Sequence, residues 1–293
     1  MPGQSPDPVT PEWAARHSVP GSPICAPEWL ALREPADAAA RATQLVDVLR
    51  EHLGGGPLTV RDLGCGTGSM GRWLAPQLDG PQEWVLHDRD TDLLALAAAN
   101  MPAVGADGRP VGATTHAGDL GGLSTTDLAG TSLVTASALL DILTGEEVDA
   151  LASICAETGT PALLTLSVAG RVAFAPGDAL DAEFASAFDE HQRRTVDGRR
   201  LLGPDAPEFA ATAFRSRGMR LHAASSPWTL GRANPALLEE WLRGWIDAAC
   251  EQRPVLAPYA GAYLQRKLAT HAEGGLRATV GHTDLLALPG ALR

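Results

Sequence analysis

A glycine-rich loop constrains the fold of this chain more than any other feature of its sequence. The loop comprises residues 62–68 and reads Asp-Leu-Gly-Cys-Gly-Thr-Gly. A short apolar run that ends near Val60 precedes it, and a helical pattern follows over residues 69–78. Glycines at such a junction allow a tight turn and a close approach of the backbone to a ligand. The loop therefore predicts an α/β domain with a ligand at the end of one strand.

Strand and helix patterns alternate on both sides of this loop. In the first part of the chain we expect a helix over 35–53, strands at 58–60, 84–87, 113–116, 133–136 and 162–168, and helices over 69–78, 92–99 and 146–157. Farther on we expect helices over 181–191, 207–217, 235–251 and 260–271, and strands at 219–223 and 277–282. This alternation predicts a Rossmann-like, mostly parallel sheet of seven strands with helices on both faces.

Three regions follow from these patterns. Residues 1–54 are expected to form an N-terminal helical arm, whose first 30 residues are rich in proline. Trp13 and Trp29 should anchor this arm, either on the surface of the domain or as a lid over the site. Residues 55–175 are expected to form a Rossmann-like core that binds a ligand at the glycine loop. Residues 176–293 are expected to supply a helical cap and the last two strands of the same sheet.

Composition disfavours several classes of function. The chain has 293 residues, a formal net charge of −12 and a sequence pI of about 5.1. An acidic surface repels phosphate backbones, so nucleic acid is not an expected partner. No apolar run reaches the ~20 residues that cross a bilayer and no signal-peptide pattern is present, so we expect no membrane partner. The cysteines lack metal-binding spacing, which predicts no metal site and reduced thiols in the cytoplasm: Cys25, Cys65, Cys155 and Cys250.

The glycine loop agrees with two binding patterns. Gly66, Gly68 and Gly71 form a G-x-G-x-x-G fingerprint, and Asp88 lies about 20 residues on, as in dinucleotide-binding proteins. Asp62 together with Gly64, Gly66 and Gly68 instead forms a D-x-G-x-G-x-G pattern, which is typical of sites for S-adenosylmethionine (SAM).

Electrostatics separates the two patterns. A carboxylate just ahead of the glycines would repel a pyrophosphate, whereas SAM carries an ammonium and a sulfonium and no phosphate. The expected strand also stops near Val60, so Arg61 and Asp62 lie between it and the glycines. The dinucleotide fingerprint instead has its first glycine directly at the end of the strand. Both arguments favour SAM.

Four segments resemble the motifs of class I SAM-dependent methyltransferases. They are VRDLGCGTGSMGRWL at 60–74, WVLHDRD at 84–90, HAGDL at 116–120 and LVTASALLD at 133–141. The resemblance implies that Asp88 binds the ribose hydroxyls, with Asp90 as the alternative. It also implies that Asp119 accepts a hydrogen bond from the adenine amino group and that Leu120 presents its backbone N–H to the ring. The turn with Ser137 should border the methionine end of the cofactor and the transferred methyl.

The region after residue 170 is similar in its order of elements to small-molecule methyltransferases of the trans-aconitate type. This coarse similarity indicates a helical cap and no particular substrate. His191 and Asp141 are candidate general bases, and Arg193 and Arg194 could hold a carboxylate or phosphate. The alternatives are a solvated helix end for the basic residues and a solvent-facing helix start for Asp141. Trp241, with Trp228 and Trp245, lines an aromatic substrate pocket or packs in the core of the cap.

These observations predict a methyltransferase that moves a methyl group from SAM to a small-molecule acceptor by in-line displacement. An NAD-dependent oxidoreductase on a Rossmann fold is one alternative. A non-catalytic SAM-fold subunit that serves as an interaction module is the other. Nothing in the sequence indicates the acceptor atom or the oligomeric state.

Overall fold

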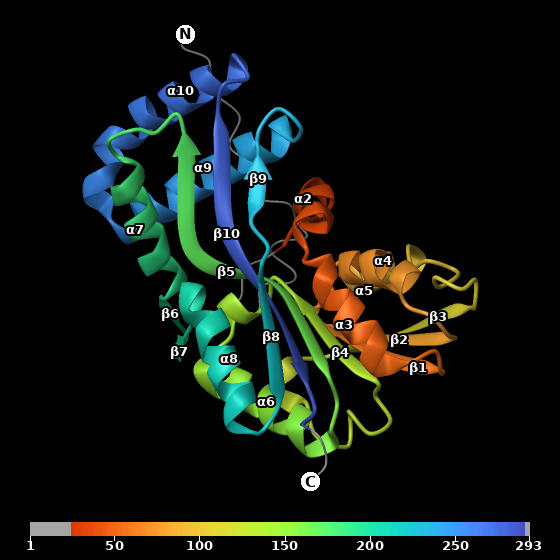
Figure 1. Cartoon of the computed structure of the whole chain (residues 1–293). Coiled ribbons are helices and arrows are strands. Elements are labelled where there is room, and N and C mark those ends of the chain that lie inside the picture. The colour runs from red at the N-terminus through yellow and green to blue at the C-terminus, as the bar shows by residue number, and fades with distance from the viewer. Residues whose placement is uncertain (1–24, 291–293) are drawn as a thin grey trace.

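One large sheet organises the chain, whose computed structural model describes residues 25–290 (Figure 1). The strand order is β3 (Val111–Ala117), β2 (Gln82–Asp88), β1 (Leu58–Leu63), β4 (Leu133–Ser137), β5 (Ala162–Ala175), β10 (Arg277–Leu288) and β8 (Arg220–Ser225). The first five strands are parallel, and β10 is antiparallel to both of its neighbours. The short strand β9 (Trp228–Leu230), which the sequence analysis missed, pairs with β10. The predicted fold class is confirmed.

Helices cover both faces of the sheet, and each face has its own apolar core. On one face, α3 (Thr43–Leu53), α4 (Ser69–Leu74) and α5 (Thr91–Ala99) pack against a cluster that includes Val60 and Trp84. On the other, α6 (Gly145–Thr158) and α8 (Ala206–Ser216) pack against a cluster that includes Leu63 and Val134. Successive residues of a strand point to opposite faces, so β1 contributes to both clusters.

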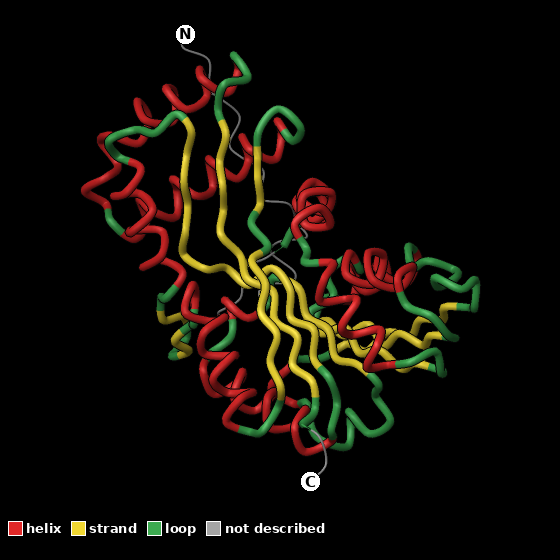
Figure 2. The backbone as a smooth tube through the Cα atoms, in the orientation of Figure 1, coloured by secondary structure: helices red, strands yellow, loops and turns green. Residues whose placement is uncertain are grey.

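The cap is built on a continuation of the sheet. Strand β5 has 14 residues and β10 has 12, so both run beyond the parallel core (Figure 2). Strand β9 pairs with the outer part of β10, and these outer strands pack with α7 (Asp181–Gln192), α9 (Pro235–Gln252) and α10 (Ala257–Ala272) around a third, aromatic-rich core. A hairpin of β6 (Thr195–Val196) and β7 (Arg199–Arg200) follows α7. We expected a cap of helices alone, because the part of β5 that enters the cap lies beyond the predicted strand end at residue 168. On β10 the predicted strand over 277–282 is the cap part, and the core part that pairs with β8 lies beyond the predicted end.

The expected helix over 35–53 is two helices, α2 (Pro27–Ala40) and α3, which meet at Arg41 and Ala42. Arg41 is extended, and the backbone N–H of Ala42 donates to a carboxylate oxygen of Asp284 at 2.8 Å. Asp284 is fully buried and also accepts from the backbone N–H of Leu166 at 2.7 Å and from the hydroxyl of Ser226. A buried carboxylate of strand β10 therefore fixes the turn between the two helices.

Helix α2 connects the cap with the glycine loop. Trp29 packs against the aromatic core of the cap, while Glu34 accepts two hydrogen bonds from Arg72 of α4. Trp13 lies outside the described residues.

Five 3₁₀ turns complete the described chain: Ala75–Gln77, Leu120–Gly122, Leu140–Ile142, Gly203–Asp205 and Pro254–Leu256. Within 25–290, no helix has the length and apolar character that crossing a membrane requires.

Candidate active site

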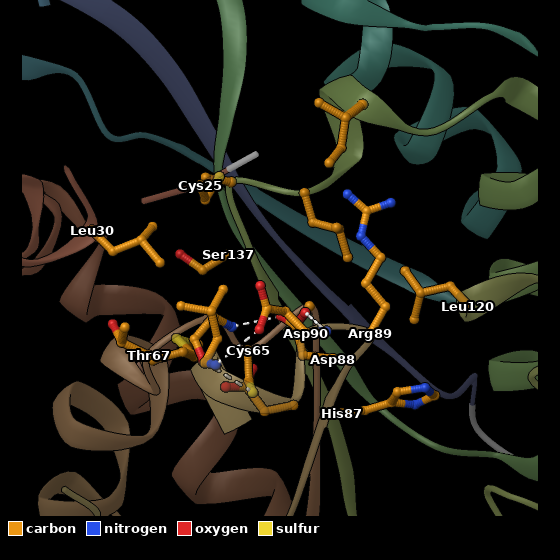
Figure 3. Close-up of a pocket in the computed structure, with 18 of the residues that line it drawn as sticks. Cys25, Leu30, Cys65, Thr67, His87, Asp88, Arg89, Asp90, Leu120 and Ser137 are labelled. Carbon is orange, nitrogen blue, oxygen red and sulfur yellow. Dashed lines mark hydrogen bonds between the residues drawn. The ribbon is translucent and has the colours of Figure 1, made fainter. Parts of the chain in front are cut away.

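A cavity lies at the carboxyl ends of β1, β2 and β4, where the strand order turns back on itself (Figure 3). Ligands of open α/β sheets bind at this kind of switch point. The cavity wall includes seven of the residues predicted to bind the cofactor: Asp62, Gly64, Gly66, Asp88, Asp119, Leu120 and Ser137. The strand ends thus bring together residues that are scattered over 75 positions of the sequence (137 minus 62).

Gly68, the eighth predicted residue, lies behind the cavity wall. Its φ is +86°, a left-handed conformation that glycine adopts without strain. A Cβ atom here would meet the Cα of Ala97 at 3.2 Å and its Cβ at 3.1 Å. Gly68 therefore lets α4 pack closely on α5 and shapes the loop from behind.

Asp62 is a fully buried carboxylate in the wall of the cavity. Its Oδ1 accepts a hydrogen bond from the hydroxyl of Thr135 on β4 at 2.7 Å. Its Oδ2 is buried and has no hydrogen-bond partner among residues 25–290. Burial raises the pKa of Asp62 to about 7. A buried acceptor without a donor is costly, so this oxygen points to a ligand that donates or carries positive charge.

The structure corrects the expected end of the first strand. Strand β1 continues to Leu63, and Asp62 pairs in register with Thr135 of β4 and Leu86 of β2. The expectation that the strand stops near Val60 was wrong, because the polar Arg61 and Asp62 find partners across neighbouring strands or connections. Gly64 directly follows the strand, whereas Gly66, the first glycine of the dinucleotide fingerprint, lies three residues beyond Leu63.

Asp88 holds the glycine loop against the end of β2. Its Oδ2 accepts from the backbone N–H of Gly66 at 2.8 Å and its Oδ1 from that of Asp90 at 3.0 Å. A carboxylate oxygen accepts more than one hydrogen bond, so each oxygen keeps capacity for a ligand. Asp90, the alternative candidate, is engaged in capping α5 through the N–H groups of Asp92 and Leu93.

The far end of the cavity lies under the loop after β3. Asp119 is exposed, and its Oδ1 accepts a hydrogen bond from the backbone N–H of Gly121 at 2.8 Å. Asp119 thereby caps the start of the 3₁₀ turn that contains Leu120. The ring of His87 is buried and lies 4.7 Å from that of His116 between centroids. Burial and the neighbouring imidazole lower the pKa of His87, so a neutral ring lines this end. Arg89, the residue after β2, lines the cavity together with Leu120 (Figure 3).

Sequence reasoning missed the residues that enclose the opposite side of the cavity. Leu30, Arg33 and Asp37 of α2 line it. Arg33 donates to both carboxylate oxygens of Asp37 at 2.9 and 3.2 Å, and its guanidinium lies 4.9 Å from the ring centroid of Trp228. Further wall residues come from the segment before α2, the turn after β4, α6 and β7: Cys25, Ile142, Leu143, Glu147 and Arg199. No local motif marks these positions, because only the tertiary fold brings α2 and β7 to the glycine loop.

Two cavity hydroxyls share one buried guanidinium. Arg41 is 3% exposed and donates to the hydroxyl oxygens of Ser69 at 3.1 Å and Ser137 at 3.0 Å. Only Ser137 was a predicted site residue. Arg41 and Ser69 carry no sequence signal, since Arg41 reaches the loop only because the N-terminal helix breaks at this residue.

The residues predicted for catalysis and substrate binding do not line the cavity. His191 contacts Glu251 and Arg194, each at 3.3 Å, and Arg193 donates to both oxygens of Asp205 at 2.7 Å. Arg193 and Arg194 thus make their contacts at the end of α7, which agrees with the alternative that these basic residues belong to a solvated helix end. Trp241 is 9% exposed and stacks on Trp245 in the cap core, as the alternative of core packing expects, and its role in a substrate pocket stays a prediction.

Asp141 is placed differently from the other predicted catalytic residues. It immediately precedes Ile142 of the cavity wall, and its Oδ1 is buried without a hydrogen-bond partner in the described chain. Burial raises its pKa to about 6, and the positive charges of Arg33 and Arg194 act against that rise. The alternative from the sequence was that Asp141 faces solvent at the start of a helix, whereas its Oδ1 is buried.

Comparison with known proteins gives structural likenesses at low identity. No family model and no curated protein matches the chain. A SAM-dependent methyltransferase from Thiobacillus denitrificans in complex with S-adenosyl-L-homocysteine is 18% identical, with 91% of this chain and 100% of that chain covered and a TM-score of 0.46. A cyclopropane synthase from Mycobacterium tuberculosis is 15% identical, with 84% and 83% covered and a TM-score of 0.45.

A third solved structure is the magnesium protoporphyrin IX methyltransferase from Synechocystis with bound S-adenosylhomocysteine (SAH). It is 16% identical, with 70% of this chain and 83% of that chain covered and a TM-score of 0.43. At such low identities, the chemistry of this chain has to be judged from its own residues.

Proposed function

We propose that this chain is a SAM-dependent methyltransferase that acts on a small-molecule acceptor. The observation that carries the proposal is the buried Oδ2 of Asp62 in the wall of the cavity, which has no hydrogen-bond partner in the part of the chain that the structure describes. A cationic, phosphate-free ligand would satisfy this oxygen, whereas a pyrophosphate beside it would be repelled. Of the ligands considered from the sequence, SAM meets this condition and NAD does not.

The remaining wall residues suit the other parts of the same ligand. Asp88 retains acceptor capacity on both oxygens, as binding of a vicinal diol requires. Asp119 and Leu120 line the cavity under the loop after β3, where they would contact the adenine edge. Ser137 lies at the opposite end with Asp62, where the methionine part would be bound.

The proposed reaction is an in-line displacement. When bound, SAM supplies a methyl group on a sulfonium, and the acceptor's lone pair forms the new bond while the carbon–sulfur pair returns to sulfur. The chain's own residues would orient the two reactants and exclude water, through the wall that α2, α6 and β7 form around the acceptor side. Asp141 is the better placed of the two proposed bases, because His191 is engaged with Glu251 and Arg194.

Ligand-induced stabilisation tests the cofactor. With SAM or SAH at a hundred times its dissociation constant, the free energy of unfolding should rise by about 2.7 kcal/mol. For a domain of this size that corresponds to an increase in Tm of about 5–10 °C, readable by differential scanning fluorimetry. NADH should give no shift.

The other outcomes of this measurement separate the alternative functions. A shift with NADH and none with SAM or SAH would favour the oxidoreductase. No shift with any of the three, confirmed by calorimetry, would favour the non-catalytic interaction module. If SAM binds, turnover against a panel of small carboxylic acids, phenols and amines would identify the acceptor class, and turnover on none of them would count against this choice of acceptors.

Replacing Asp88 tests the assignment of the ribose site. Asp88→Ala should weaken SAM binding by about 1.5–3 kcal/mol, because hydrogen bonds to a charged acceptor are lost. Isothermal titration calorimetry measures the change, and Glu83→Gln on the outer, exposed part of β2 is the matched control. An unchanged affinity in Asp88→Ala would show that the ligand does not reach the end of β2.

A further inference from the structure

The ion pair of α2 in the cavity wall is held from several sides. Arg33 donates through Nε and Nη2 to the two oxygens of Asp37, and its guanidinium lies 4.9 Å from the ring centroid of Trp228. Asp37 is buried and also accepts from the indole N–H of Trp228 at 2.9 Å. The orientation of the guanidinium is therefore fixed before a ligand arrives, which lowers the entropy lost on binding.

One edge of this guanidinium has no partner in the described chain. An arginine has five N–H donors in a planar fork, and Asp37 occupies the edge formed by Nε and Nη2. Nη1 makes no hydrogen bond within residues 25–290, and Arg33 lines the cavity with 16% of its side chain exposed. The open edge, formed by Nη1 and Nη2, thus offers two parallel donors, the arrangement that binds both oxygens of a carboxylate.

The charges around Arg33 place it on the acceptor side of the cavity. Arg41 acts electrostatically on Asp62, where the methionine part of the cofactor would be bound, whereas Arg33 acts on Asp141. Asp141 is the better placed of the two proposed bases, and Ile142 beside it belongs to the cavity wall. An acceptor in this part of the cavity would therefore meet the open edge of Arg33.

The shape and charge of the site favour a carboxylate over a phosphate. Arg33 and Arg199 line the acceptor side, and each is already paired with a carboxylate, that of Asp37 and that of Glu147. A dianionic phosphate would therefore meet little uncompensated positive charge. A carboxylate carries a single charge, and its two oxygens match two N–H groups on one edge of a guanidinium.

On the basis of the proposed function, we infer that the methyl acceptor carries a carboxylate that the open edge of Arg33 binds, and that Asp37 is the positioning residue that orients this edge. The carboxylate is an anchor and not the methylated group, because hydrogen bonds from a cation lower the basicity of its oxygens. The methylated atom belongs to a hydroxyl or amine of the same molecule. On transfer, this group loses a proton, its lone pair binds the methyl carbon, and the carbon–sulfur pair stays on sulfur as SAH.

Matched pairs of small molecules test the inference. Each hydroxy or amino acid is compared with its own primary amide, which has nearly the same shape and lacks the negative charge. The pairs are lactate with lactamide, salicylate with salicylamide, and alanine with alaninamide. Calorimetry measures their binding to the SAH-saturated full chain, and turnover with SAM gives kcat and KM. In at least one pair the acid should bind about 10- to 100-fold more tightly than the amide, as expected for hydrogen bonds to a charged group.

Variants of the ion pair separate anchoring from structure. The Arg33→Gln, Asp37→Asn double variant leaves no buried charge unpaired, and its asparagine can still accept from Trp228. It should lose the preference for the acid through KM, with kcat within about threefold of the wild type. Arg33→Lys should keep part of the preference because the charge is kept. Asp37→Asn alone should also keep part, because the guanidinium remains but is no longer oriented.

The matched control is the Arg243→Gln, Glu239→Gln double variant. This exposed ion pair of α9 has the same spacing along a helix as the pair of α2. Its removal should leave the preference for the acid unchanged. If the double variant of α2 does not fold, the comparison of acids with amides on the wild-type chain alone decides.

Several outcomes would overturn the inference, and they differ from failure of the proposed function. If the wild type binds SAH but prefers none of the acids to its amide, Arg33 anchors no carboxylate. A methyl ester as product would make the carboxylate the nucleophile and not the anchor. A loss of SAH affinity in the double variant of α2 would assign Arg33 to the cofactor. Binding of neither SAM nor SAH by the wild type would instead reject the proposed function itself.

Discussion

The Asp62→Asn variant is expected to bind SAM at least about 100-fold more weakly than the wild type. Removing one partner of a buried charge pair costs about 3–5 kcal/mol. The asparagine keeps the size of the side chain, and its carbonyl oxygen can still accept from the hydroxyl of Thr135. Its amide nitrogen, however, replaces the free Oδ2 with a donor that faces the cofactor's ammonium. Calorimetry with SAM and SAH measures the loss.

The same carboxylate predicts a pH dependence of binding. Because the pKa of Asp62 is raised to about 7, the protein must lose a proton before it can bind a cation at neutral pH. The affinity for SAM should therefore rise about fivefold from about pH 6 to about pH 7. The rise should end where the ligand's own α-amino group deprotonates, near a pKa of about 7.7–8.0. Asp62→Asn should show no rise in this interval.

Stability of the unliganded protein should change in the opposite direction. An acid whose pKa is raised by folding favours the folded state while it is protonated, and this contribution is lost as the pH rises through the folded pKa. The wild type should thus lose stability relative to Asp62→Asn as the pH rises from about 4, the ordinary pKa of an aspartate, to about 7, and its stability should be level above that. Bound SAM should offset the loss. Asp79→Asn, at an exposed ion pair with Arg50, is the control for both measurements. Undiminished SAM affinity in Asp62→Asn would refute the assignment of the ammonium site.

The sequence predicted which residues at the strand ends come together in the cavity wall, because their signals are local. Each candidate lies at or just after the carboxyl end of a strand: Asp62 in β1, Asp88 in β2, Asp119 after β3 and Ser137 in β4. Parallel strands bring these ends together whatever the rest of the chain does. The glycine loop could be recognised from its own residues together with the strand before it and the helix after it.

The break between α2 and α3 could not be predicted in the same way. The hydrogen bond that fixes it joins Ala42 to Asp284, which lie 242 residues apart. Helical spacing of Leu45 and Leu49 continues the pattern of the preceding residues, so a single helix was the natural expectation. The placement of Arg41 in the site follows from this break and was therefore missed as well.

On the acceptor side, local patterns mislead for a different reason. An amphipathic helix shows which face is apolar and not what covers that face. Trp241 and Trp245 lie on the apolar face of α9, which packs against Phe174 and Tyr263 in the cap core and not against the cavity. The predicted basic pair Arg193 and Arg194 likewise ends a helix outside the cavity. Arg33, which does line it, comes from a helix whose start the sequence did not indicate.

Replacing Asp141 should separate chemistry from cofactor binding. If the acceptor is a hydroxyl or a protonated amine, Asp141→Asn should lower kcat by about 10²- to 10⁴-fold, the usual contribution of a general base. The affinity for SAH should stay within about twofold, because Asp141, unlike the proposed cofactor ligands Asp62 and Asp88, is not among the described residues that line the cavity. The readout is turnover with an acceptor found in the panel of acids, phenols and amines, together with calorimetry of SAH.

The pH profile gives this prediction a second, independent readout. Burial raises the pKa of Asp141 to about 6, so the wild-type kcat should fall as the pH drops through that value and should be level above it. Asp141→Asn should remove the fall along with the activity, whereas Asp149→Asn, in an exposed ion pair of α6 with Arg217, should leave both unchanged. An Asp141→Asn enzyme with full kcat would mean that the acceptor reacts without this base, as a neutral amine or a thiolate would, so that positioning alone drives the transfer.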